Sequence, residues 1–215
     1  MKHYTKPLLA VVGAAAVVAG CATQPSPQEL DRQAQVAINA SFRSEGIAKV
    51  DRLKQDRMQA ACSSDKPPSD AVKDEIMAEA RASVKFPAGG RYFGDWQQGE
   101  KLAQSGRGLT WTDPSAATKD NGGNCYNCHQ LSKAELSFGT IGPSLYQYGR
   151  NRGVTDLAAP TAQPIIEYTW IKLYNAKAFS ACSTMPRFGH EGMLDTAQMA
   201  DLMALLLDPK SSVNQ

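Results

Sequence analysis

The sequence has few of the side chains that build metal sites, and it has little net charge. It contains five cysteines and three histidines among 215 residues, with one C-x-x-C pair and no paired histidines. The absence of a second ligand pair argues against a tetrahedral zinc site. Residues 1–20 hold two of the 23 basic residues and none of the 21 acidic ones, so the remainder carries 21 of each. Without a basic block or stripe, we expect no nucleic-acid partner.

The apolar run at residues 8–19 is too short to cross a bilayer, because a membrane-spanning helix needs about twenty apolar residues. It follows a basic start, which is typical of a secretory signal. The run Val18-Ala19-Gly20-Cys21 is similar to a bacterial lipobox, in which cleavage leaves the cysteine as a lipidated first residue. We therefore expect residues 1–20 to be a lipoprotein signal peptide, with lipidation at Cys21 and localisation on the periplasmic side of a membrane. The alternative is an ordinary signal peptide that leaves Cys21 a plain thiol.

The pattern of the remaining chain predicts an all-α protein, because no strand is convincingly signalled and no internal repeat is visible. Apolar periodicity and breakers predict two or three helices over residues 28–85 and further helices at residues 95–104, 164–175 and 195–208. Asp95 with Gln98 and Asp195 with Gln198 have the spacing of a capping box at the start of two of these helices. Gly99 lies inside a predicted helix at a cost of about 1 kcal/mol against alanine, which suggests that another backbone approaches closely there. Proline and glycine at 87–90 mark a boundary between a tether and helical extension, residues 21–90, and a C-terminal domain, residues 91–215.

One short motif, at residues 125–129, indicates a specific kind of cofactor site. The run Cys125-Tyr126-Asn127-Cys128-His129 is a C-x-x-C-H sequence, the attachment signature of a c-type haem. Each thiol can add to one vinyl group of the porphyrin, and the adjacent imidazole is placed to bind the iron from one side. A thioredoxin-like dithiol is the alternative, but its chemistry does not need the histidine. We predict one covalent haem c on Cys125 and Cys128, with His129 as an axial ligand.

The second axial ligand decides between electron transfer and ligand binding. Met185 precedes Pro186 in a loop between two predicted helices, where its thioether can turn toward the far face of a porphyrin. Met77, Met199 and Met203 fall on apolar helical stripes and are more simply core residues, and Met58 and Met193 have no supporting context. We predict Met185 as the ligand of a low-spin iron, with His190 as the alternative, because a methionine ligand favours ferrous iron and raises the potential.

Further residues are candidates to surround the predicted haem. The turn Gly142-Pro143-Ser144-Leu145 follows the motif, and the Pro143 carbonyl can accept the second ring N–H of His129 and fix its tautomer. A bare turn is the alternative. Arg150, Arg152 and Arg187 are candidates to pair with haem propionates, although solvated surface arginines are the commoner case.

Two cysteines, Cys62 and Cys182, remain after lipid and haem are assigned. In an oxidising periplasm, two leftover thiols most often pair, so we predict a disulfide between them. The alternative is two buried free thiols that act as small apolar side chains.

The helix before the motif, the motif itself, the Gly142-Pro143 turn and the Met185-Pro186 loop resemble the class I cytochrome c fold. More narrowly, the chain is similar to SoxX, the monohaem subunit of the SoxXA cytochrome of bacterial thiosulfate oxidation. The segments that carry this likeness are residues 139–145, 148–150, 174–176 and 183–190. The resemblance covers residue 95 to the C-terminus, and it leaves residues 22–90 and the lipobox without a counterpart.

This resemblance implies a role as well as a fold. His129 and Met185 would be the axial ligands, and the partners would be a SoxA-like haem subunit and a SoxYZ-like carrier whose cysteine receives thiosulfate. The complex would be an L-cysteine S-thiosulfotransferase, and this chain would take the electrons and pass them to a downstream cytochrome c. Forming the sulfur–sulfur bond releases two electrons, whereas one six-coordinate iron accepts one, so catalysis is expected mainly on the partner. The alternatives are a free-standing lipid-anchored electron carrier and a haem-based gas sensor.

Overall fold

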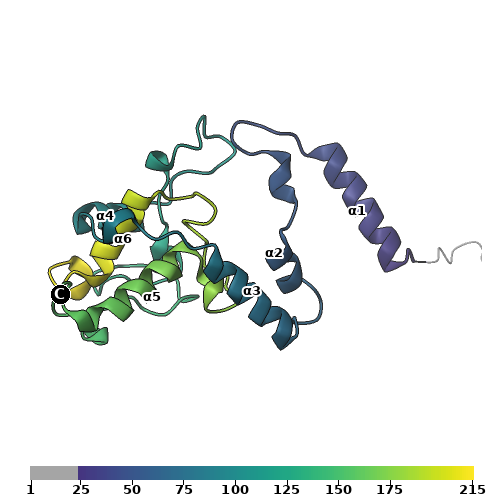
Figure 1. The fold of residues 1–215 in the computed structure, drawn as a ribbon. Coiled ribbons are helices and arrows are strands. Elements are labelled where there is room, and N and C mark those ends of the chain that lie inside the picture. The colour runs from purple at the N-terminus through teal and green to yellow at the C-terminus, as the bar shows by residue number, and fades with distance from the viewer. Residues whose placement is uncertain (1–23) are drawn as a thin grey trace, which may run out of the picture. The chain divides into compact units, whose positions relative to one another are not determined.

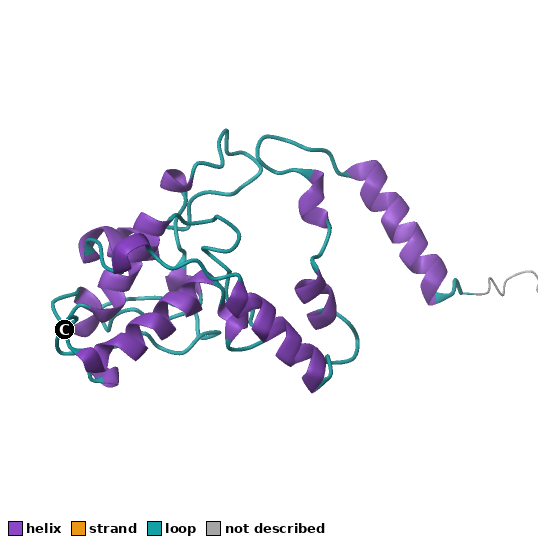
Figure 2. Ribbon diagram, in the orientation of Figure 1, coloured by secondary structure: helices purple, strands orange, loops and turns teal. Residues whose placement is uncertain are grey.

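The computed structural model describes residues 24–215, in which helices alternate with long loops (Figure 2). No strand occurs in this range, where the nearest thing to a sheet is one isolated antiparallel bridge between Glu45 and Ala48. The all-α class is therefore confirmed for residues 24–215. Contacts divide the described residues into two units, residues 24–43 and 44–215. In the first unit, α1 (Pro27–Ser41) begins at Ser26, whose hydroxyl accepts the amide of Glu29 at 3.2 Å.

Three α-helices lie between residues 27 and 82, in agreement with the two or three predicted for residues 28–85, but the stretch 28–61 is not continuously helical. The helical conformation ends at Phe42 and resumes as a short 3₁₀ turn at Val50–Leu53 and as α2 (Arg57–Cys62). Between them, Gly46 has φ +50°, and a Cβ on it would lie 2.9 Å from the carbonyl oxygen of Asp113. A backbone contact with a distant loop thus sets the conformation here, which local helix propensity does not encode.

The main core forms where α4 (Trp96–Gln104) crosses α6 (Thr196–Leu207), with α5 (Gln163–Tyr174) packed beside α6 (Figure 1). A Cβ at Gly99 would lie 2.2 Å from the carbonyl oxygen of Asp201, which confirms the predicted close approach. Six large apolar side chains of this core are almost inaccessible to solvent: Trp170, Met199, Leu202, Met203, Leu205 and Leu207. Burying each one contributes about 1.5–3 kcal/mol.

The N-termini of α6 and α4 are capped in different ways. The Asp195 and Gln198 pair forms the predicted capping box of α6. Asp95 caps α4 by accepting the Gln97 amide at 2.8 Å, but the predicted box with Gln98 is wrong. The amide of Asp95 donates instead to the carboxylate of Asp201 at 2.7 Å, so a tertiary partner replaces the local one.

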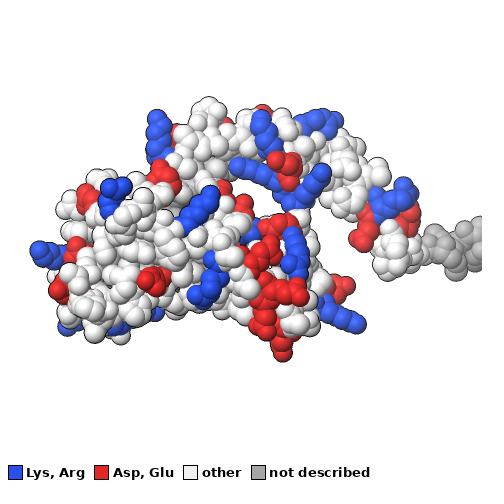
Figure 3. Space-filling model, viewed as in Figure 1, with Lys and Arg blue, Asp and Glu red and all other residues white. Residues whose placement is uncertain are grey.

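A second apolar cluster joins α3 (Asp70–Ala82) and α2 to the segment that follows α5. Its buried members are Met58, Ile76, Ala80, Ile171, Ala178 and Ala181. The indole N–H of Trp170 donates to the carbonyl oxygen of Lys85 at 2.9 Å. Residues 44–90 therefore pack into the same unit as the C-terminal part of the chain. Acidic side chains gather over α3 on the face shown in Figure 3, where Arg57 of α2 pairs with Glu75 and Glu79.

Candidate cofactor pocket

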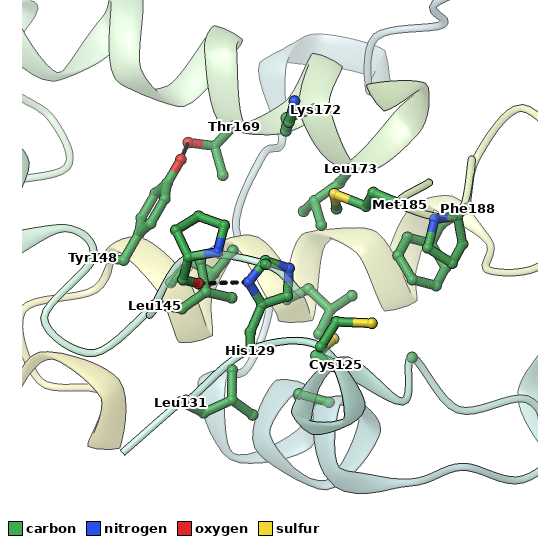
Figure 4. Close-up of a pocket in the computed structure, with 18 of the residues that line it drawn as sticks. Cys125, His129, Leu131, Leu145, Tyr148, Thr169, Lys172, Leu173, Met185 and Phe188 are labelled. Atoms are coloured by element: carbon green, nitrogen blue, oxygen red, sulfur yellow. Dashed lines mark hydrogen bonds between the residues drawn. The ribbon is translucent and has the colours of Figure 1, made fainter. Parts of the chain in front are cut away.

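A cavity of about 480 Å³ opens between the C-x-x-C-H loop, the 141–145 turn, α5, the 183–188 loop and α6 (Figure 4). Its volume lies within the usual range of ligand sites. Much of its wall is apolar: Leu131, Leu145, Leu173, Phe188, Leu202 and Leu206. Such a wall suits a large, mostly apolar group better than a small polar substrate.

The motif coils into one tight turn on the wall of this cavity. The amide of His129 donates to the carbonyl oxygen of Cys125 at 2.9 Å, and both motif cysteines and His129 line the cavity. Burial raises the pKa of the Cys125 thiol to about 12, so the thiol is neutral near pH 7. A redox-active dithiol works through a thiolate with a lowered pKa. The environment of Cys125 therefore speaks against the thioredoxin-like alternative.

The ring of His129 is fixed by the turn that follows the motif. Its Nδ1 atom lies 2.6 Å from the carbonyl oxygen of Pro143, which is the contact expected from the sequence (Figure 4). Because a carbonyl oxygen only accepts, Nδ1 carries the hydrogen, which in a neutral ring places the lone pair on Nε2. A Cβ at Gly142 would lie 2.1 Å from Cε1 of the same ring. Gly142 thus leaves the space that the imidazole occupies.

Met185 lies across the cavity from the motif. Its side chain is half-buried, lines the cavity and packs against the main core, and Figure 4 shows it on the opposite side from His129 and Cys125. His190, the alternative ligand, is not among the lining residues. The amide of His190 donates to the carbonyl oxygen of Tyr174, and its ring lies 3.9 Å from the carboxylate of Glu191. Of the two candidates, Met185 is the one that faces the pocket.

The three candidate arginines lie differently with respect to the cavity. Arg152 lines the cavity, with its guanidinium carbon 3.6 Å from the centre of the Tyr148 ring, but Arg150 and Arg187 do not line it. Arg187 is buried and turned away, with ion pairs to Asp56 at 2.7 Å and to Glu191 at 2.5 Å. The sequence places Arg187 on the same loop as Met185 but does not determine the direction of its side chain.

Sequence reasoning missed Lys172 and the Tyr148–Thr169 pair. Lys172 is the second cation on the cavity wall, and burial lowers its pKa. The position of this lysine in a mostly apolar predicted helix was the available signal. The hydroxyl of Tyr148 lies 3.0 Å from that of Thr169 inside the cavity wall, and burial raises the pKa of Tyr148. Both polar groups are thereby satisfied in an apolar setting.

The structure also joins Cys62, the last residue of α2, to Cys182 by the predicted disulfide bond, with sulfur atoms 2.03 Å apart. Cys125 and Cys128 remain free thiols. The two thiols of the motif are therefore not used in a disulfide, whereas Cys62 and Cys182 join segments that are far apart in the sequence.

The chain is similar to an uncharacterized lipoprotein of Aquifex aeolicus (strain VF5), at 32% identity over 206 residues. The match covers 90% of this chain and 92% of that protein. The chain belongs to the family of this lipoprotein. No protein-family model matches it. The match within the lipoprotein family is too long to be confined to residues 91–215, so it includes much of the helical extension as well as the pocket.

Two findings concern the relation to a membrane. Cys21, the predicted site of lipidation, lies outside the described residues. Within residues 24–215, none of the helices combines the length and the apolar composition that a bilayer crossing requires.

Proposed function

We propose that this chain is a monohaem c-type cytochrome with a class I cytochrome c-like domain that transfers electrons as a subunit of a SoxXA-type thiosulfate-oxidising complex. The observation that carries the cytochrome assignment is the hydrogen bond from His129 to the Pro143 carbonyl, next to the two free motif thiols. It prepares Nε2 as a lone-pair donor, which is the state that a metal-binding histidine needs.

The donor set of the pocket fits a haem c. Cys125 and Cys128 would hold it through thioether links, and His129 and Met185 would be its axial ligands from opposite walls. Bound there, it would supply reversible one-electron transfer, with a potential that the methionine raises.

The remaining wall residues have roles of their own. The apolar side chains exclude water from the pocket, and the Pro143 carbonyl holds the proton on Nδ1 of His129. Arg152 and Lys172 supply positive charge at the wall, where propionates would need compensation. With His129 and Met185 both holding the group, substrate would find no free place on the metal, which favours electron transfer over catalysis or gas sensing.

The narrower assignment rests on the likeness of segments around residues 139–150, 174–176 and 183–190 to SoxX. In that role, a SoxA-like subunit would carry the catalytic site and a SoxYZ-like carrier would present the cysteine thiol. Joining that thiol to thiosulfate releases two electrons. This chain would accept them one at a time and pass each to a downstream cytochrome c.

Reconstitution tests the narrower assignment. We expect the chain to copurify with a second cytochrome, and we expect thiosulfate to reduce its haem only when that partner and the carrier are both present. A haem that respiratory donors reduce in the absence of any partner, with no thiosulfate response in the full mixture, would instead identify a free-standing electron carrier.

We also propose that the mature chain is held at the periplasmic side of a membrane by lipid on Cys21. The lipobox-like sequence and the lipoprotein relative support this assignment. Cys21→Ser should move the protein to the soluble fraction after export. Continued membrane association of that variant would contradict the lipid anchor.

A further inference from the structure

The loop that carries Met185 is fastened to α2 on both sides of the methionine. Three positions before it, Cys182 forms the disulfide bond to Cys62, the last residue of α2. Two positions after it, Arg187 forms an ion pair with Asp56, the N-cap residue of α2. One six-residue helix thus supplies both attachment points of the segment that presents the thioether.

The ion pair restricts the position of the loop that carries Arg187, because the arginine side chain is buried. Its side chain is 8% exposed, and Nη2 lies 2.7 Å from Oδ2 of Asp56 and 2.5 Å from the carboxylate of Glu191. Its Nη1 lies 3.6 Å from the sulfur of Met58. Arg187 would still have Glu191 as a partner after losing Asp56, but its buried guanidinium would give up a charge-assisted hydrogen bond that solvent cannot readily replace. Arg187 therefore cannot leave Asp56 without a cost in free energy.

α2 is itself held in place, which allows it to act as an anchor. Met58 is 4% exposed and packs in the second apolar cluster with Ile76 and Ala80 of α3. Asp56 and Gln59 form a reciprocal capping box at the N-terminus of α2. The helix is too short to be stable alone, so these tertiary and capping contacts fix its position.

We propose that α2 is a clasp that holds Met185 at the pocket, with the Cys62–Cys182 bond and the Asp56–Arg187 pair as its two fasteners. This inference rests on the proposed function, in which Met185 binds the iron. A loop segment with both ends fixed has few conformations to lose when its side chain binds, so the thioether stays in place at a low entropic cost. Asp56 and the disulfide are therefore positioning elements for the sixth ligand.

Competition by imidazole in the oxidised haem protein measures how firmly Met185 is held, because added imidazole binds only when the thioether is displaced. The double variant Cys62→Ser/Cys182→Ser should bind imidazole about tenfold more tightly than the wild type. Asp56→Asn should raise the affinity by about threefold, since asparagine keeps the N-cap and removes only the charge. The matched control is Arg57→Gln, whose ion pairs to Glu75 and Glu79 are exposed, and it should leave the affinity unchanged.

Hydrogen exchange on the same proteins gives a second readout that does not depend on ligation. Amides of residues 183–188 should exchange faster in the double variant and in Asp56→Asn, whereas those of α4 and α6 should not change. Faster exchange that is equal throughout the protein would mean a general loss of stability and would overturn the clasp. If the double variant does not fold, imidazole affinity and hydrogen exchange of Asp56→Asn alone test whether α2 holds Met185.

Haem content separates a failure of this inference from a failure of the proposed function. A mature wild-type protein without covalent haem would refute the cytochrome assignment itself. If haem is attached and both variants bind imidazole as the wild type does, the clasp is refuted and the cytochrome assignment stands.

Discussion

Nδ1 of His129 lies 2.6 Å from the carbonyl oxygen of Pro143, and Gly142 leaves open the space that the imidazole ring fills. Gly142→Ala would place a Cβ 2.1 Å from Cε1 of that ring, so the ring must move and lose its hydrogen bond. Loss of such an outer contact typically weakens metal binding by about 10–100-fold. We expect a reduced haem content per chain, measured from haem absorbance against protein mass.

The matched control for that change is Gly153→Ala. Gly153 has a positive φ, +74°, and a Cβ there would meet nothing within 4 Å. The control variant should lose some stability to backbone strain but keep its haem. An equal loss of haem in both variants would contradict the role assigned to Gly142.

Met185→Ala tests the axial ligand on the far wall of the pocket. The variant should lose the thioether-to-iron charge-transfer band, and its reduction potential should fall, because the methionine favours ferrous iron. The reduced variant should also bind carbon monoxide rapidly. Absorption spectra and a redox titration give both results. His190→Ala is the control and should keep the band, whereas a band that persists in Met185→Ala would refute the ligand assignment.

The crossing of α4 and α6 at Gly99 predicts a stability effect. A Cβ at this position would lie 2.2 Å from the carbonyl oxygen of Asp201, and that backbone cannot move aside easily. Gly99→Ala should therefore lower the free energy of unfolding by about 1–3 kcal/mol, although alanine is the better helix former. Urea denaturation measures the change. Gln98→Ala, at an exposed site one residue earlier, should stay within about 0.5 kcal/mol of the wild type.

Asp56 predicts a pH dependence. Partial burial disfavours its ionised form, but the Gln59 amide and the Arg187 guanidinium outweigh that effect and hold the pKa of the carboxyl below its ordinary value of 3.8. Because the pKa is lowered in the folded state, the stabilisation is fully present above the unfolded pKa and is lost as pH falls through the folded one. The stability advantage of the wild type over Asp56→Asn should therefore be constant from about pH 5 to 7 and shrink below pH 3.8. Urea midpoints across this range measure it, and an advantage that grows with acidity would contradict the ion pair.

The helices were predictable where their signals are local. The α3, α4, α5 and α6 segments carry their own apolar period or cap, and the structure has a helix at each. The segment at residues 42–56 was not predictable, because its conformation depends on the contact between Gly46 and the backbone of Asp113. The same limit explains the missing capping box at Asp95, whose amide binds Asp201 instead.

The pocket residues were also predictable only where their placement depends on nearby sequence. Cys125, Cys128 and His129 are adjacent in sequence, so their grouping follows from the motif, and the Pro143 carbonyl is within reach of the ring from a nearby turn. The direction of Arg187 was not predictable, because its partner Asp56 lies far earlier in the chain, in a segment that the resemblance to cytochromes does not cover. Charge and spacing alone could not separate an arginine that faces the pocket from one that faces α2.

The intact mass of the mature protein, produced together with the cytochrome maturation machinery, tests the central claim most directly. We predict the mass of the processed, lipidated chain plus one haem, together with a Soret band, and we predict that Cys125→Ser/Cys128→Ser loses the added mass. A wild-type product with the mass of the lipidated polypeptide alone and no Soret band would contradict the account.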